Sequence, residues 1–117
     1  MSFHDLLNGL LSELEIPYFE GSPEFEGEWP ELFVTYSVDD GPAHWGCGQE
    51  FCTRYNVTFS IYSTGENMAQ NAEDTGTALD TILTGNGFTR ISGSFGFGSD
   101  FPDYYRRIVE YCCIISK

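Results

Sequence analysis

Three side chains that could hold a metal ion lie close together near the middle of the chain. His44, Cys47 and Cys52 fall within nine residues, and Glu50 between them could act as a fourth ligand. Zinc is bound in proteins by imidazole nitrogen and thiolate sulfur. A structural zinc site usually has a second closely spaced pair of ligands, and the only other histidine is His4. The spacing therefore favours an incidental loop, with a small zinc-binding module as the lesser alternative, and we expect no cofactor.

The four cysteines offer no clear catalytic nucleophile. A cysteine nucleophile needs a base and an accessible thiol with a lowered pKa. Cys52 has only His44 near it in sequence, and Cys112 and Cys113 are neighbours in a stretch with the pattern of a strand. Side chains alternate across a strand, so one of this pair is expected in the core and the other on the opposite face. We expect free thiols and no catalytic residue.

A glycine-rich segment spaces its glycines like a phosphate-binding loop. The segment is Gly93-Ser94-Phe95-Gly96-Phe97-Gly98. A phosphate loop lies between a strand and a helix and commonly carries a lysine. Here a strand is expected to follow, and the first lysine is Lys117. The segment instead predicts a hairpin tip, at which exposed Phe95 and Phe97 could contact a partner, as could Trp45 in the loop from Gly41 to Glu50.

The chain is strongly acidic. It carries 18 Asp+Glu against five Lys+Arg, a formal net charge of −13, and its first 31 residues hold eight acids with no Lys or Arg. Such a charge repels polyphosphate and anionic lipid. We therefore expect no tight binding to nucleic acid and no membrane binding. The acidic pairs Asp39-Asp40 and Glu73-Asp74 are interpreted as solvated charge, because adjacent residues do not face each other in a strand or a helix.

The length and composition indicate one folded domain spanning residues 1–117. The chain has 117 residues, of which 41% are hydrophobic and 16% aromatic, so it can build a core. No run approaches the ~20 apolar residues of a membrane-spanning helix, and the first residues lack the basic start of a signal peptide. We expect synthesis in the cytoplasm.

The first half of the chain predicts one helix and a hairpin. A helical stripe is formed by Phe3, Leu6, Leu7, Leu10, Leu11 and Leu14, and Pro17 ends it. Tyr18-Phe19 could begin a short strand, and residues 20–31 predict a loop. Residues 32–38 and 54–62 alternate with the period of strands and should form a long hairpin, with Asp39-Asp40-Gly41-Pro42 ending the first strand.

The second half predicts a helix and two more strands. Ser63 and Glu66 have the spacing of a capping box, and an apolar stripe follows from Met68 to Leu83. Gly76 should weaken this helix by roughly 1 kcal/mol relative to Ala, and Gly85-Asn86-Gly87 should stop it. Residues 88–98 and 104–115 then predict strands, with Arg107 interrupting the inward face of the last one. The predicted fold is α+β: an antiparallel sheet of four to five strands with two helices packed on one face, in the order α-β-β-β-α-β-β.

This order of elements resembles the small tail-terminator, or tail-completion, proteins at the neck of long-tailed bacteriophages and prophages. The resemblance covers nearly the whole chain. Its features are a leading helix that ends at Glu15-Ile16-Pro17-Tyr18, strands at residues 30–38 and 54–63, a helix that closes before Gly87-Phe88-Thr89-Arg90, and Asp103-Tyr104-Tyr105-Arg106-Arg107 at the start of the last strand. The loop from Gly41 to Glu50 and the low count of basic residues depart from the family pattern.

The resemblance implies a structural virion protein with no catalytic residue. It would form a ring, typically a homohexamer, that caps the tail tube, contacts the tail-tube and head-completion proteins, and assembles in the cytoplasm of the host bacterium. An acidic lumen would let DNA pass without holding its phosphates. The composition leaves another alternative open, a small acidic inhibitor that imitates the charge of DNA and occupies a basic protein.

Overall fold

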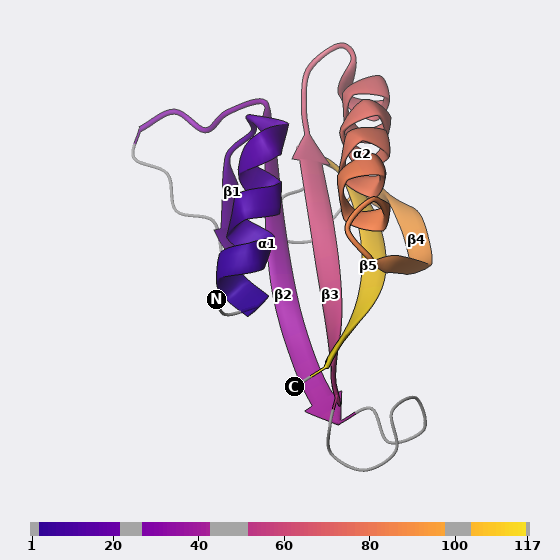
Figure 1. Cartoon of the computed structure of the whole chain (residues 1–117). Helices are drawn as coiled ribbons and strands as arrows, with labels where there is room; N and C mark the ends of the chain where they lie inside the picture. Colours follow the sequence, from indigo (N-terminus) through magenta and orange to yellow (C-terminus); the bar gives the residue numbers. More distant parts are fainter. Residues whose placement is uncertain (1–2, 22–26, 43–51, 98–103, 117) are drawn as a thin grey trace.

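The computed structural model describes residues 3–21, 27–42, 52–97 and 104–116, and these ranges contain two α-helices and five strands (Figure 1). The predicted order of helices and strands is confirmed. In chain order the elements are α1 (Phe3–Leu11), the short 3-10 helix η1 (Ser12–Leu14), β1 (Tyr18–Glu20), β2 (Leu32–Pro42), β3 (Cys52–Ser63), α2 (Met68–Thr84), β4 (Thr89–Phe97) and β5 (Tyr105–Ser116).

The five strands form one sheet in the order β1-β2-β3-β5-β4. The predicted hairpin is confirmed, because β2 and β3 pair antiparallel over their whole lengths, and β5 and β4 continue the antiparallel pattern. The exception is β1, which pairs parallel with β2. Tyr18, Phe19 and Glu20 pair in register with Val34, Thr35 and Tyr36, so β2 runs in the same direction as β1. The sheet is therefore mixed but mostly antiparallel, and the predicted antiparallel sheet is confirmed apart from the parallel pairing of β1.

Both α-helices cover the same face of the sheet, as predicted (Figure 1). The α1 stripe is confirmed: Phe3, Leu7, Leu10 and Leu11 are buried, and Leu6 and Leu14 pack at its margin. The strands contribute a matching set of buried side chains on the helix side of the sheet, listed in chain order as Val34, Tyr36, Val57, Phe59, Ile61, Val109, Tyr111 and Cys113. This α+β core packs both helices against the sheet, whose two edge strands are β1 and β4.

Two local predictions about strand and helix ends are wrong. The run from Asp39 to Pro42 does not end β2, because these residues stay paired with β3, from Asn56 to Thr53. Ser63 and Glu66 do not form a capping box. Ser63 is the buried last residue of β3, α2 begins five residues later at Met68, and the residue before it, Asn67, makes no side-chain cap hydrogen bond. Long-range strand pairing overrides the local turn and cap signals at both places.

The end of α2 follows the sequence more closely. Phe88 N donates to the Leu83 carbonyl (3.0 Å), and Gly87 has a positive φ of 90°. This left-handed conformation favours glycine, so the predicted stop at Gly85-Asn86-Gly87 is confirmed. The chain then turns directly into β4.

Candidate assembly surface

Most of the residues singled out as metal ligands lie outside the described residues. His44, Trp45 and Cys47 belong to the segment 43–51, and Cys52 is placed only as the first residue of β3, opposite Ser116. Within the described ranges, no three or more His, Cys, Asp or Glu side chains lie close enough together to hold a metal ion. The zinc alternative and the contact role of Trp45 therefore stay predictions.

Phe95 and Phe97 do not lie at a hairpin tip. Both belong to β4, where Phe95 pairs with Arg107 and Phe97 with Tyr105 of β5. Gly93 and Gly96 lie within a paired strand, so the prediction that Phe95 and Phe97 form a tip is wrong; Gly98 lies outside the described residues. A contact role for Phe95 and Phe97 stays a prediction, now placed on an edge strand of the sheet.

The neighbouring cysteines of β5 alternate across the sheet as predicted. Cys113 is buried on the helix side, whereas Cys112 is half-buried on the opposite face, and both are free thiols. Burial, and secondarily the neighbouring Cys112, raises the pKa of the Cys113 thiol. A raised pKa keeps the nucleophilic thiolate scarce at neutral pH. Cys113 is therefore a packing residue.

The charged residues divide the described part of the chain into two unequal halves. Residues 3–21 and 27–42, which form α1, η1, β1 and β2, contain eight Asp or Glu and no Lys or Arg. Residues 52–97 and 104–116, which form β3, α2, β4 and β5, contain five acids and four arginines. The formal charges are thus −8 and −1. The first half ends at the β1 edge of the sheet and the second at the β4 edge, so charge is polarised across the sheet.

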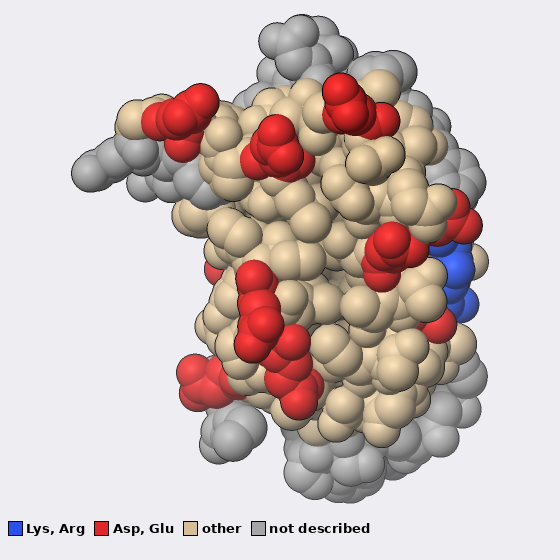
Figure 2. Space-filling model, turned by 90° about the horizontal axis from the view of Figure 1, so that it is seen from above, with Lys and Arg blue, Asp and Glu red and all other residues tan. Residues whose placement is uncertain are grey.

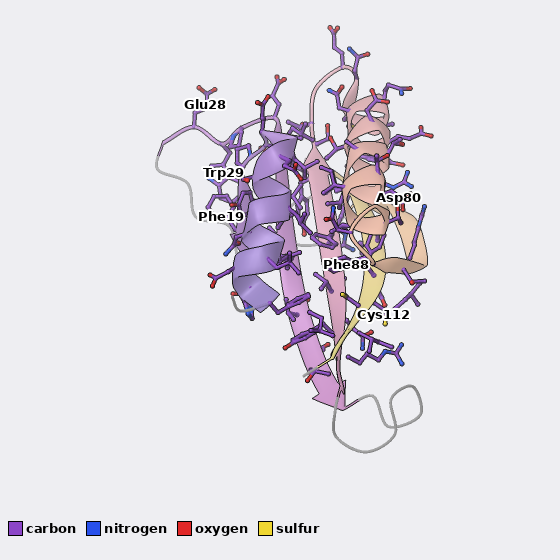
Figure 3. All side chains as sticks on the ribbon, viewed as in Figure 1. Phe19, Glu28, Trp29, Asp80, Phe88 and Cys112 are labelled. Atoms are coloured by element: carbon purple, nitrogen blue, oxygen red, sulfur yellow. The ribbon has the colours of Figure 1, made fainter. Side chains whose placement is uncertain are left out.

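The space-filling view in Figure 2 shows this polarity in the basic side chains alone. Figure 2 shows carboxylates spread over the end of the molecule seen from above, with blue side chains only at one side. Figure 3 places Phe19, Glu28 and Trp29 at the β1 side and Asp80 and Cys112 on the side of α2 and β5. The sequence predicted an acidic first third, but only the strand order puts it at one edge of the sheet.

The β4 side contains a packed group of polar residues between α2 and the sheet. The Tyr111 hydroxyl donates to Asp80 Oδ1 of α2 at 2.7 Å. Burial is the largest cause that raises the pKa of Tyr111, followed by the hydrogen bond to Asp80, while nearby Arg90 and Arg107 lower it. The tyrosine stays neutral, and the two guanidinium groups lie close enough to act on it electrostatically.

Two glycines make room for these guanidinium groups. A Cβ atom built on Gly76 of α2 would lie 2.8 Å from Arg107 Nε, and one built on Gly93 of β4 would lie 2.6 Å from an Arg90 Nη atom. Arg107 therefore passes under α2, and Arg90 extends along β4 over Gly93. The helical pattern indicated Gly76 only as a weak point of the helix, and no motif singled out Arg90.

The β1 side carries the acidic counterpart. Glu20 of β1 is half-exposed, and its Oε2 lies 3.0 Å from His4 Nε2 of α1. Next to it, the Tyr36 hydroxyl donates to Asn8 Oδ1 of α1 at 3.1 Å. Burial, and secondarily the charge of Glu20, raises the pKa of Tyr36. These contacts attach α1 to the β1 edge, and the Glu20 side chain stays half-exposed.

The sheet face opposite the helices has an aromatic group at one end. Phe33 is buried there by stacking with Tyr62 (4.9 Å between ring centroids) and by edge contacts with Trp29 and Tyr104. The Tyr104 hydroxyl donates to the Pro30 carbonyl at 2.7 Å. This group attaches residues 29–30 to the sheet, which is a structural role.

An open depression at the start of α2 is lined only by polar residues and glycine: Glu31, Thr64, Gly65, Glu66, Asn67 and Asn71. Small-molecule sites are mostly apolar and concave, so this depression is not a ligand pocket.

Comparison with known proteins gave no match: neither a scan against protein-family models nor a search of curated proteins found a similar family or relative. Among the described residues, neither helix has the length and apolar character needed to cross a membrane.

Proposed function

We propose that this chain is a structural subunit of a phage or prophage neck, which forms a ring on the end of the tail tube and provides the surface that joins tail to head. The ring is a homohexamer in this proposal, its other contacts are the tail-tube and head-completion proteins, and its place is the virion. The order of helices and strands that resembles the tail-terminator family supports this proposal.

The observation that carries the proposal is the charge polarity of the subunit. A two-fold dimer brings the same patch of both copies together, whereas head-to-tail contacts join two different patches and close into rings. Two copies joined through their β1 sides would bring together two halves that each have a formal charge of −8. A head-to-tail contact instead places the acidic half of one copy beside the other half of the next copy, whose formal charge is only −1. Polarity of this kind favours a ring over a two-fold dimer.

Salt should control how readily the ring forms. Six copies carry a formal charge of −78, six times that of one chain. The Debye length falls from ~10 Å at 0.1 M salt to ~3 Å at 1 M, so salt weakens repulsion between carboxylates on different copies. We expect a monomer or weak associate in dilute, low-salt solution, and larger assemblies at high salt, at high concentration or on a tail-tube end.

The test combines light scattering over a grid of salt and protein concentrations with electron microscopy and binding to purified tail tubes. Rings of uniform size, or protein bound only at tube ends, would support the proposal. The DNA-imitating inhibitor is the second candidate, favoured by the carboxylates spread over the face in Figure 2. A strict monomer that ignores tail tubes and binds a basic protein one to one would replace the ring proposal with the inhibitor.

A further inference from the structure

We propose that neighbouring copies join edge to edge, with β4 of one copy beside β1 of the next, and that Arg90 pairs with Glu20 across this junction. The inference rests on the proposed ring and names the two surfaces that would build it. The occupant of the β4 edge is therefore a second copy of this chain.

The directions of the two edge strands allow such a junction. Within the described residues β1 and β4 lie at opposite ends of the sheet. β1 runs parallel to β2, and the pairs β2–β3, β3–β5 and β5–β4 are each antiparallel. β4 therefore runs opposite to β1. A neighbour placed across the sheet without being turned over thus brings β4 antiparallel to β1. Antiparallel edges can pair directly through their backbone groups.

The strand register puts Glu20 and Gly93 in one row across the sheet. The row consists of one residue from each strand, in the order Glu20, Tyr36, Phe59, Val109 and Gly93. Directly opposed residues share a face of the sheet, and Tyr36, Phe59 and Val109 all belong to the core beneath the helices. Glu20 and Gly93 are therefore the two ends of one row on the helix side.

Arg90 reaches into this same row. It pairs with Tyr111, two residues along β5 from Val109 in the row of Gly93, which is about 7 Å at ~3.4 Å per residue. Its guanidinium group extends back over Gly93, where a Cβ atom would lie 2.6 Å from the Arg90 nitrogen. If neighbouring copies are related by rotation about an axis parallel to the strands, each row stays at the same height along that axis. The Arg90 guanidinium of one copy would then face the Glu20 carboxylate of the next copy.

The exposure of these groups fits a contact that forms only on assembly. Arg90 is exposed, Glu20 is half-exposed, and the neighbouring Ile91 is 48% exposed at the irregularity in β4 between Arg90 and Ser92. An apolar side chain beside a complementary charge pair is typical of an interface. Edge strands also use charges and bulges to prevent unwanted pairing. If Arg90 protects the edge in this way, its removal should strengthen association, whereas removal of an interface residue should weaken it. One experiment therefore distinguishes the two roles of Arg90.

The experiment is a charge exchange. Arg90→Glu and Glu20→Arg are each made alone and together, and association is measured by light scattering and sedimentation under conditions in which the wild type assembles. Like charges facing each other at an interface cost several kcal/mol, so each single reversal should weaken association at least about tenfold. The double variant restores opposite charges and the wild-type net charge, and should return association to about the wild-type level.

Matched controls separate the pair from net charge. Arg54→Glu on the central strand β3 changes the net charge by the same amount as Arg90→Glu. Glu66→Arg before α2 does the same for Glu20→Arg. Each control variant should associate more strongly than the edge variant it matches, and closer to the wild-type level. Circular dichroism melting checks the fold of each variant. If Arg90→Glu does not fold, because the arginine acts electrostatically on Tyr111 and its partner Asp80 is already acidic, Arg90→Gln takes its place beside the Glu20→Arg variant.

Each other outcome overturns a different statement. A wild type that never associates, in solution or on tail tubes, rejects the proposed function and this junction with it. A wild type that associates while the charge variants match it rejects only the junction. Stronger association of the Arg90 variants shows that Arg90 protects the edge. Loss in both singles without recovery in the double rejects the Arg90–Glu20 pair.

Discussion

Replacing Gly76 by alanine should destabilise the protein, although the same change stabilises most helices. Gly76 lies near the middle of α2 and is buried. A Cβ atom there would lie 2.8 Å from Arg107 Nε, 3.1 Å from its Cδ and 3.3 Å from its Cζ. The first distance is well inside van der Waals contact, and Arg107 Nε is itself buried. The guanidinium group can make room only by moving within a packed region.

The size of the effect is a difference between two terms. Alanine in place of glycine in a helix interior gains about 1 kcal/mol. Forcing an extra methyl group into a well-packed site costs about 1–3 kcal/mol. The two together give a net loss of about 1 kcal/mol in the free energy of unfolding.

Gly9 in α1 provides the matched control, because it is exposed and a Cβ atom built on it meets nothing within 4 Å. Gly9→Ala should therefore stabilise the protein by about 0.5–1 kcal/mol. The two alanine variants should differ by about 2 kcal/mol in urea denaturation, measured as a shift of the midpoint at unchanged slope.

A double-mutant cycle assigns the effect to Arg107. In an Arg107→Ala background the side chain that blocks the site is absent, so Gly76→Ala should gain the ordinary helix term of about 1 kcal/mol. The reasoning is refuted if Gly76→Ala in the native background stabilises the protein as much as Gly9→Ala does. It is also refuted if the cost of Gly76→Ala is the same with and without Arg107.

Three further predictions test the core, the cysteine loop and the buried tyrosine. Leu7→Asp should abolish folding, because it buries an unpaired carboxylate in a fully buried site, whereas Gly9→Asp on the exposed side of the same helix should fold; circular dichroism and solubility compare the two. Cys47→Ser combined with Cys52→Ser should leave fold and assembly unchanged, and stoichiometric zinc in the native protein, lost with stability in the double variant, would contradict this. Tyr111→Phe should reduce the fall in stability above about pH 10: the pKa of Tyr111 is raised by folding from its ordinary 10.0, so its contribution is fully present below that pH and is lost as the pH rises past it. An unchanged pH dependence of the unfolding midpoint would show that another group causes the fall.

Local sequence patterns determined the elements that have a strong period of their own. The stripe from Phe3 to Leu14 predicts α1, the alternation from Arg54 to Tyr62 predicts β3, and the glycines after Thr84 mark the end of α2. In each case the side chains that share one face are also those that must be buried, so burial and local geometry agree. The hairpin of β2 and β3 follows as well, since the two strands are close in sequence.

Local signals failed where a neighbouring strand supplied the missing interactions. Asp39 to Pro42 has the composition of a turn, yet β3 offers a continuous partner strand and the chain stays extended. Gly93 to Phe97 has the composition of a loop, yet β5 pairs with all of it. Backbone groups that find hydrogen-bond partners in a sheet have no need of a turn, and no short window of sequence contains that information.

The candidate surface depended on the tertiary structure almost entirely. The sequence by itself determined the total charge, its concentration in the first part of the chain and the fold class. Only the strand order placed the acidic half at the β1 edge and Arg90 at the β4 edge, and only the register put Glu20 and Gly93 in one row. These positions are set by strand pairings that join residues as far apart in the sequence as Cys52 and Ser116. Such pairings depend on how the whole core packs. The sequence around each residue therefore does not show which residues share a row of the sheet.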